Sequence, residues 1–142
     1  MIRKLLPIGS ALFLILVTFT SCEKDFATPR IKDLYGNWRM KNLSINGQPA
    51  TNFAPFTPLS LFGLQESGRF YFDYNGGTWT IDGNQLVLRR GDDGPIFRDY
   101  TIIHSSKDSL VVSALQVEGD LYTNFPQFGP DQRFLTITHF GR

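Results

Sequence analysis

Turn signals recur along the chain from Leu34 onward, and their spacing restricts the folds open to it. Asn46-Gly47, Asn75-Gly76-Gly77 and Asp82-Gly83-Asn84 separate short segments in which apolar and polar residues alternate. Turn signals every roughly 8–12 residues are typical of a β-sandwich or β-barrel. Alternation with a period of two places successive side chains on opposite faces of a strand. The pattern therefore predicts an all-β domain built from short antiparallel strands.

About eight strands fit this pattern. They are expected at Gly36–Ile45, Leu59–Gln65, Arg69–Tyr74, Thr78–Ile81, Gln85–Arg89, Ile96–His104, Leu110–Val117 and Arg133–Phe140. Phe70, Phe72 and Tyr74 fall on one face of their strand, while Trp79 and Ile81 are expected to face inward. Short links between neighbours imply antiparallel pairing in an up-and-down order. Closure into a barrel removes the sheet edges, and an eight-stranded barrel can hold one small ligand.

The first 21 residues have a different character. Arg3 and Lys4 precede an uncharged run from Leu5 to Thr20. Its apolar centre, residues 11–17, is shorter than the ~20 residues that a membrane-spanning helix needs. A positively charged N-terminus, a short apolar run and small residues at the end of that run predict a secretory signal peptide over residues 1–21. The alternative is an N-terminal core helix, but the run has no polar face.

The run ends at Phe19-Thr20-Ser21-Cys22, which resembles the lipobox of bacterial lipoproteins. The resemblance implies that Cys22 is joined to diacylglycerol and becomes the first residue of the mature chain. Cys22 is the only cysteine, so no internal disulfide is expected. Each buried CH₂ adds about 0.8 kcal/mol of membrane affinity, so several acyl chains form a stable anchor. The alternative is ordinary cleavage nearby, which would leave a free thiol.

Residues 22–33 are predicted to be a lipidated polar tether. Glu23 is not the aspartate that often retains lipoproteins at the inner membrane, so the resemblance implies the outer membrane. Lys24-Asp25 resembles in part the charged export signal of surface lipoproteins from Bacteroidota. A solvated linker explains the same residues, so the periplasmic and cell-surface faces both remain open.

The mature chain has room for one domain, over residues 34–142. Removal of residues 1–21 leaves 121 residues with 12 basic and 13 acidic side chains. One domain of this length is expected rather than two. No basic stripe is present, so nucleic acid is not an expected partner.

The start of the first predicted strand reads Leu34-Tyr35-Gly36-Asn37-Trp38. A Gly-x-Trp motif in this place, on a short barrel pattern, resembles the lipocalin and lipocalin-like families. The stretches Gly77–Leu86 and Ser105–Val112 resemble hairpins of small bacterial lipocalin-like lipoproteins. The resemblance covers Leu34 to Phe140 and implies a small lipocalin-like barrel. The chain has no room for the C-terminal helix of full-size lipocalins.

In that family an arginine near the chain end packs across the tryptophan, which here is Trp38. Arg133 and Arg142 are the candidates. With eight alternating strands, the last strand returns to the end where the first began. Arg142 is therefore predicted to lie near Trp38, and Arg133 at the opposite end.

The same alternation places the two longest loops together at the end away from the tether. They cover Gly47–Pro58 and Glu118–Asp131. Both contain aromatic residues, which are the predicted ligand-binding side chains: Phe53, Phe56, Tyr122, Phe125 and Phe128. These rings either cap the barrel and complete its core or form an apolar mouth for a ligand. We expect the second arrangement.

No group of residues in the sequence indicates a reaction. His104 and His139 lack a second metal ligand at suitable spacing, and no Gly-x-Ser-x-Gly elbow is present. Asp92-Asp93 lacks the spacing of a calcium loop and fits a solvated turn. We therefore expect no metal, no cofactor and no enzymatic activity. The predicted function is binding of a small hydrophobic or amphipathic molecule, and the alternative is docking onto an envelope protein or glycan through the aromatic loops.

Overall fold

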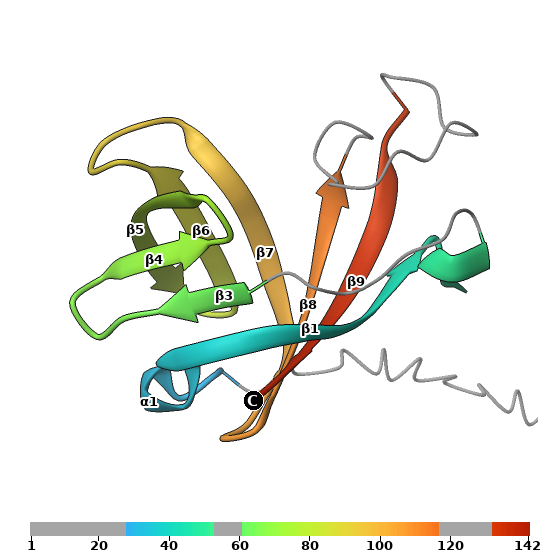
Figure 1. The fold of residues 1–142 in the computed structure, drawn as a ribbon, viewed down its shortest axis with the longest axis horizontal. Helices are drawn as coiled ribbons and strands as arrows, with labels where there is room; N and C mark the ends of the chain where they lie inside the picture. Colours follow the sequence, from blue (N-terminus) through green and yellow to red (C-terminus); the bar gives the residue numbers. More distant parts are fainter. Residues whose placement is uncertain (1–27, 53–60, 117–131) are drawn as a thin grey trace, which may run out of the picture.

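One antiparallel sheet forms nearly all of the fold. The computed structural model describes residues 28–52, 61–116 and 132–142 (Figure 1). Its elements in chain order are α1 (Ile31–Leu34), β1 (Gly36–Ile45), β2 (Gln48–Pro49), the 3₁₀ helix η1 (Ala50–Asn52), β3 (Leu61–Leu64), β4 (Arg69–Phe72), β5 (Asn75–Asp82), β6 (Gln85–Arg90), β7 (Ile96–Ser105), β8 (Ser109–Gln116) and β9 (Phe134–Gly141).

The sheet closes on itself. The order is β2-β1-β3-β4-β5-β6-β7-β8-β9, and β1 also pairs with β9. Every pairing between these strands is antiparallel. The result is an eight-stranded up-and-down barrel with one extra short strand, β2, so the predicted fold class is confirmed. Closure leaves few free edges for association with other chains.

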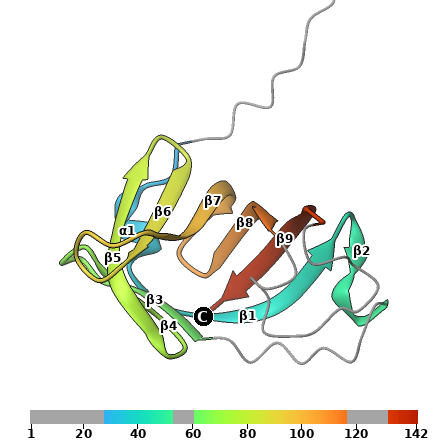
Figure 2. The same ribbon diagram turned by 90° about the horizontal axis from the view of Figure 1, so that it is seen from above.

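Strand β1 joins the two sides of the barrel. Its first part, Gly36–Arg39, pairs with β3, and its later part, from Arg39 to Ile45, pairs with β9. Figure 2 shows β1 running from beside β3 to beside β9 and β2. The register with β9 shifts between Met40 and Asn42. A bulge of this kind bends a strand and increases its twist, which lets a small sheet close.

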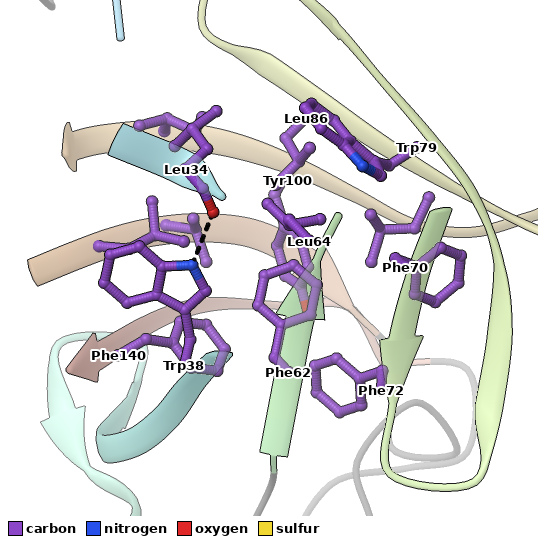
Figure 3. Close-up of a cluster of buried hydrophobic side chains, with 14 of the residues drawn as sticks. Leu34, Trp38, Phe62, Leu64, Phe70, Phe72, Trp79, Leu86, Tyr100 and Phe140 are labelled. Carbon is purple, nitrogen blue, oxygen red and sulfur yellow. Dashed lines mark hydrogen bonds between the residues drawn. The ribbon is translucent and has the colours of Figure 1, made fainter. Parts of the chain in front are cut away.

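Aromatic side chains from several strands fill the core (Figure 3). The ring of Phe62 lies 5.4 Å from that of Phe140 and 5.6 Å from that of Phe72, centroid to centroid. Trp38 is fully buried, and Trp79 nearly so. Burial of each large apolar side chain contributes about 1.5–3 kcal/mol, so this cluster is the main stabilising feature of the barrel. The inward orientation predicted for Trp79 is confirmed.

The hairpin between β4 and β5 differs from the prediction. The turn is formed by Asp73 and Tyr74 rather than by Asn75-Gly76-Gly77, and Asp73 adopts a positive φ of 50°. Tyr74 is therefore fully exposed instead of sharing a face with the buried Phe70 and Phe72. Gly77 lies within β5 for another reason: a Cβ there would stand 1.8 Å from the carbonyl oxygen of Arg89.

The start of the folded domain also differs from the prediction. Residues 31–33 were assigned to the tether, but they form α1 together with Leu34. Leu34 is fully buried, and Pro29 is buried as well. Two apolar residues in a segment of four are too few to show a helical period, so this short helix was not predicted. Neither β2 nor η1 was predicted, and both lie within the segment assigned to the first long loop.

Candidate functional site

The end of the barrel next to α1 is closed by side chains. Trp38 packs beneath α1, and its Nε1 donates a hydrogen bond of 2.9 Å to the carbonyl oxygen of Leu34 (Figure 3). On the other side of this end, Tyr35 contacts the ring of Trp79 edge-on at 6.1 Å between centroids. Trp79 in turn donates to the carbonyl oxygen of Gln65 at 3.0 Å. These contacts tie α1 and the β3–β4 turn to the core.

Arg142 completes the closed end. Its guanidinium carbon lies 4.4 Å from the centroid of the Trp38 ring, which confirms the predicted pairing. The same guanidinium donates to the carbonyl oxygen of Asp33 at 3.1 Å and to that of Tyr35. Arg133 precedes β9 at the opposite end, as predicted. The C-terminus therefore fastens α1 and the start of β1 (Figure 1).

The bases of the two long loops meet at the other end, which we call the far end. The backbone N–H of Asn46, after β1, donates to the carbonyl oxygen of Leu135 at 2.8 Å. The side-chain oxygen of Asn46 accepts from the N–H of Leu135 at 3.0 Å. The predicted meeting of the loops at one end is confirmed for their bases. Asn46 supports it because an asparagine tolerates the positive φ of 50° at this turn.

The predicted ligand-binding aromatics lie outside the described residues, and so does Cys22. They are Phe53, Phe56, Tyr122, Phe125 and Phe128. The candidate site is therefore built from the strand ends and loop bases that surround the far end.

Most of the exposed large apolar side chains of the described residues belong to strand ends or turns of the far end. Six large hydrophobic side chains are exposed among the described residues, and five of them lie on strand ends or turns at this end. Leu115 and Leu135 are cross-strand partners, with 61% and 46% of their surfaces exposed. The sixth, Ile31, lies in α1. We call the five the apolar rim: Leu61, Tyr74, Ile96, Leu115 and Leu135.

The inner wall at the far end mixes aliphatic and polar side chains. Leu43 and Ile45 of β1 lie opposite Thr138 and Thr136 of β9, and all four are buried. The hydroxyl of Thr136 donates to the side-chain oxygen of Gln116, which is also buried, at 2.9 Å. Small-molecule sites commonly combine apolar walls with a few placed polar groups. This wall has that composition, and the buried ring of Phe134, the cross-strand partner of Gln116, lies beside it.

Two arginines border the far end on the β6–β7 side. Arg98 is the cross-strand partner of the inward-facing Leu88, so its side chain lies on the inner face. Arg90 follows Leu88 by two residues, and side chains two apart on a strand point to the same face of the sheet. Their guanidinium carbons lie 4.3 Å and 5.1 Å, respectively, from the centroid of the buried Phe97 ring. We call Arg90 and Arg98 the guanidinium pair.

The sequence contained a signal for Arg98 that the prediction did not use. Arg98 alternates in phase with Tyr100 and Ile102, which are buried in the core. A charged residue in phase with core residues is informative, because lysine and arginine are seldom placed inside without a partner. The contact of Arg90 was harder to foresee, since it depends on a bulge at Phe97 that changes the register between β6 and β7.

A shallow pocket of about 440 Å³ lies on the outer face, beside the apolar rim. The β7–β8 ladder begins at Thr101–Ser113, and the two strands diverge from there toward the far end (Figure 1). Both of these residues line the pocket, together with Asp99, Arg133 and two leucines of the rim. The far end thus presents apolar and polar groups on its outer wall as well.

Within the described ranges, no three His, Cys, Asp or Glu side chains are grouped so that they suit a metal ion. None of the helices in the same ranges has the length and apolar character needed to cross a membrane. Comparison with models of known protein families, with curated proteins and with solved structures gave no match to this chain.

Proposed function

We propose that the protein is a lipid-anchored, lipocalin-like lipoprotein of the bacterial outer membrane that binds a small hydrophobic or amphipathic molecule at the far end of its barrel. The anchor rests on residues 1–21, which have the pattern of a signal peptide, and on Cys22 in its lipobox-like setting. The binding function rests on the contrast between the two ends of the barrel.

The apolar rim is the observation that carries the proposal. Exposed apolar side chains concentrated in one region commonly mark a binding surface, whereas scattered ones carry no such meaning. Here five of the six exposed large hydrophobic side chains of the described residues lie on strand ends or turns of one end of the barrel, and Leu115 and Leu135 are neighbours there. The opposite end is closed by Trp38, Leu34 and Arg142. The buried hydroxyl and amide groups of the inner wall suit a ligand that is not wholly apolar.

A dye titration tests this proposal. The full chain is secreted with Cys22→Ser, which prevents acylation, and is titrated with the neutral dye Nile red. Native mass spectrometry of the same sample detects any lipid that co-purifies. We expect saturable binding of the dye, because burial of its rings against the rim removes apolar surface from water.

Matched variants locate the binding. Ile96→Ser removes a rim side chain that is 52% exposed, and Ile31→Ser removes one in α1 that is 45% exposed. We expect Ile96→Ser to weaken dye binding about threefold to tenfold, which corresponds to the loss of about 1 kcal/mol of apolar contact. Ile31→Ser should leave binding unchanged. Absence of binding, or equal weakening by both variants, would contradict the proposal.

Docking onto an envelope protein or glycan is a second candidate, favoured by the orientation of two rim residues. Leu115 and Leu135 face outward and line the outer pocket with Asp99 and Arg133. Such a surface suits a partner better than a ligand held inside. This candidate predicts that a Leu115→Ser/Leu135→Ser variant loses a co-purifying envelope component while its Nile red affinity stays unchanged.

A further inference from the structure

The barrel wall opens between β7 and β8 at the far end. The ladder between these two strands begins at the pair Thr101–Ser113. Beyond that pair each strand continues and is paired on its other side: β7 pairs with β6 as far as Ile96, and β8 pairs with β9 as far as Gln116. Figure 1 shows β7 and β8 separating toward this end. We call the space between these two strand edges the β7–β8 gap.

Backbone polar groups point into the β7–β8 gap. The N–H of Ile102 donates to the carbonyl oxygen of Asn84 at 2.8 Å, so the polar groups of Ile102 point toward β6. Successive residues of a strand direct these groups to opposite edges, so those of Asp99 point toward β8. The same alternation turns the groups of Leu115, two residues beyond Ser113, toward β7. No strand of the described residues pairs with these groups, and such an edge can accept an added extended chain.

The outer pocket, of about 440 Å³, lies along this gap. Asp99 lines it from β7 and Leu115 from β8, while Leu135 and Arg133 line it from β9 and from the residue before β9. The buried Ala114 also lines it, so the pocket reaches into the wall of the barrel. Polar side chains from the row where the ladder begins complete the lining: Gln85, Thr101 and Ser113.

Asp99 and Arg133 give the outer pocket one charge of each sign. Both residues are exposed, and within the described ranges neither side chain forms an ion pair or a hydrogen bond. A ligand can therefore reach both charges without displacing another side chain. A ligand with a single charge is attracted by one of these groups and repelled by the other, whereas a zwitterion is attracted by both. The two charges thus favour a zwitterionic ligand.

We infer that the outer pocket binds a short, extended, apolar peptide with free ends. Its ammonium group contacts Asp99, its carboxylate contacts Arg133, and its side chains pack on Leu115 and Leu135. A guanidinium can donate two parallel hydrogen bonds to a carboxylate. The peptide backbone adds to the open edges of the gap, as peptides do at other sheet edges. The inference concerns the outer face and does not depend on a ligand inside the barrel, so it goes beyond the proposed function.

Four forms of one tripeptide test the inference. Leucyl-alanyl-leucine places both leucine side chains on one face when it is extended, because the side chains of a strand alternate. It is titrated into the ¹⁵N-labelled Cys22→Ser chain with free ends, with an acetylated N-terminus, with an amidated C-terminus, and with both ends blocked. We expect each block to weaken binding about threefold to fivefold, as the loss of an exposed charge pair predicts. The backbone amide signals of Asp99 and Leu115 should shift on binding.

Variants assign each end of the peptide to its partner. Asp99→Asn should weaken the free tripeptide about threefold to fivefold and leave the N-acetylated form unchanged. Arg133→Gln should do the same for the free and the C-amidated forms. Asp93→Asn and Arg89→Gln are the controls, because both residues are exposed and lie outside the lining of the pocket. Comparison of each variant with the matching blocked peptide isolates one charge pair from any general effect on the fold.

Free leucine tests the contribution of the gap. It has both charges and an apolar side chain but no peptide group to pair with a strand edge. We expect it to bind at least about threefold more weakly than the free tripeptide, because the peptide hydrogen bonds are absent. Equal affinity of leucine and the tripeptide would show that no extended chain is bound, and the inference would then be wrong.

The outcomes also separate this inference from the proposed function. If the doubly blocked tripeptide binds as tightly as the free one, or if Asp93→Asn weakens the free form as much as Asp99→Asn does, the inference is wrong. Nile red binding to Asp99→Asn should equal its binding to the Cys22→Ser chain. Dye binding without peptide binding leaves the proposed function standing and refutes the inference. Peptide binding that requires both free ends, without dye binding, supports the inference and refutes the proposed function.

Discussion

Removal of the Arg142 side chain should destabilise the whole barrel, although the residue lies on the surface. Its guanidinium covers the Trp38 ring and donates to the carbonyl oxygens of Asp33 and Tyr35. These contacts join the last strand to α1 and to the start of the first strand. Arg142→Ala removes all of them at once and exposes one face of a tryptophan that is otherwise fully buried.

The size of the effect follows from these contacts. A guanidinium over an indole contributes about 0.5–2 kcal/mol. A hydrogen bond from a charged donor contributes about 1.5–3 kcal/mol, and the lower value applies because water reaches this group. We therefore expect Arg142→Ala to lower the free energy of unfolding by about 2–3 kcal/mol. For a domain of this size, that corresponds to a fall in Tm of about 6–15 °C.

Urea unfolding followed by tryptophan fluorescence measures this loss directly. Arg133→Ala is the control, because Arg133 is an exposed arginine at the opposite end of β9. It should change stability by less than about 0.5 kcal/mol, as surface substitutions usually do. Arg142→Lys keeps the charge and loses the planar group, so it should fall between the two. Equal stability of Arg142→Ala and Arg133→Ala would refute the reasoning.

Three further substitutions test the packing of the barrel, each by urea unfolding. Gly77→Ala should lower the free energy of unfolding by about 3 kcal/mol or more, because its Cβ would stand 1.8 Å from a backbone oxygen that cannot rotate away. Gly76→Ala is the control: its nearest contact would be at 3.4 Å, so it should lower the free energy of unfolding by less than about 1 kcal/mol. Gly63→Ala would place its Cβ 2.1 Å from the Tyr71 ring, so it should cost about 1–3 kcal/mol alone and much less in a Tyr71→Ala background. Additive effects of that pair would contradict the contact. Thr136→Val removes a buried hydroxyl that bonds to β8 and should cost about 1–2 kcal/mol, and an unchanged stability would show that the bond contributes nothing.

The alternation of residues and the turn dipeptides were sufficient to predict the barrel. Asn46-Gly47 and Asp82-Gly83-Asn84 form turns as expected, and β1 has the predicted bounds. An even number of short antiparallel strands then brings the two chain ends to one end of the barrel. This is why the contact between Trp38 and Arg142 followed from the order of the strands and the family resemblance.

The error at the turn before β5 has a tertiary cause, which is contact between segments that are not adjacent in the sequence. Asn75-Gly76-Gly77 has the composition of a turn, yet Gly77 is required where the backbone of β6 passes over β5. Gly63 of β3 is likewise covered by the ring of Tyr71, whose hydroxyl reaches across β3 and donates to the side-chain oxygen of Asn37. Neither contact produces a pattern of alternating apolar and polar residues in the surrounding sequence, so neither could be predicted from it.

The candidate site was predicted less completely than the fold. Alternation placed the long loops at one end but did not identify the rim, because Leu115 and Leu135 have the composition of ordinary strand residues. They are exposed because they alternate with buried residues of β8 and β9 and therefore face outward. Alternation along β7 could have placed the Arg98 side chain on the inner face. Its contact with the Phe97 ring could not be predicted in this way, because it depends on the bulge in β7.

The extra strand β2 shows why the two ends of the barrel keep their orientation. A strand that crossed the barrel between β1 and β3 would reverse the direction of every later strand. β2 does not cross it, because it pairs only with the last two residues of β1. Leu64, at the end of β3, therefore lies opposite Gly36, at the start of β1. The apolar rim and the guanidinium pair stay at the end opposite α1. Since Cys22 precedes α1, a lipid on Cys22 would hold the closed end toward the membrane and leave the rim accessible to a ligand that arrives from outside.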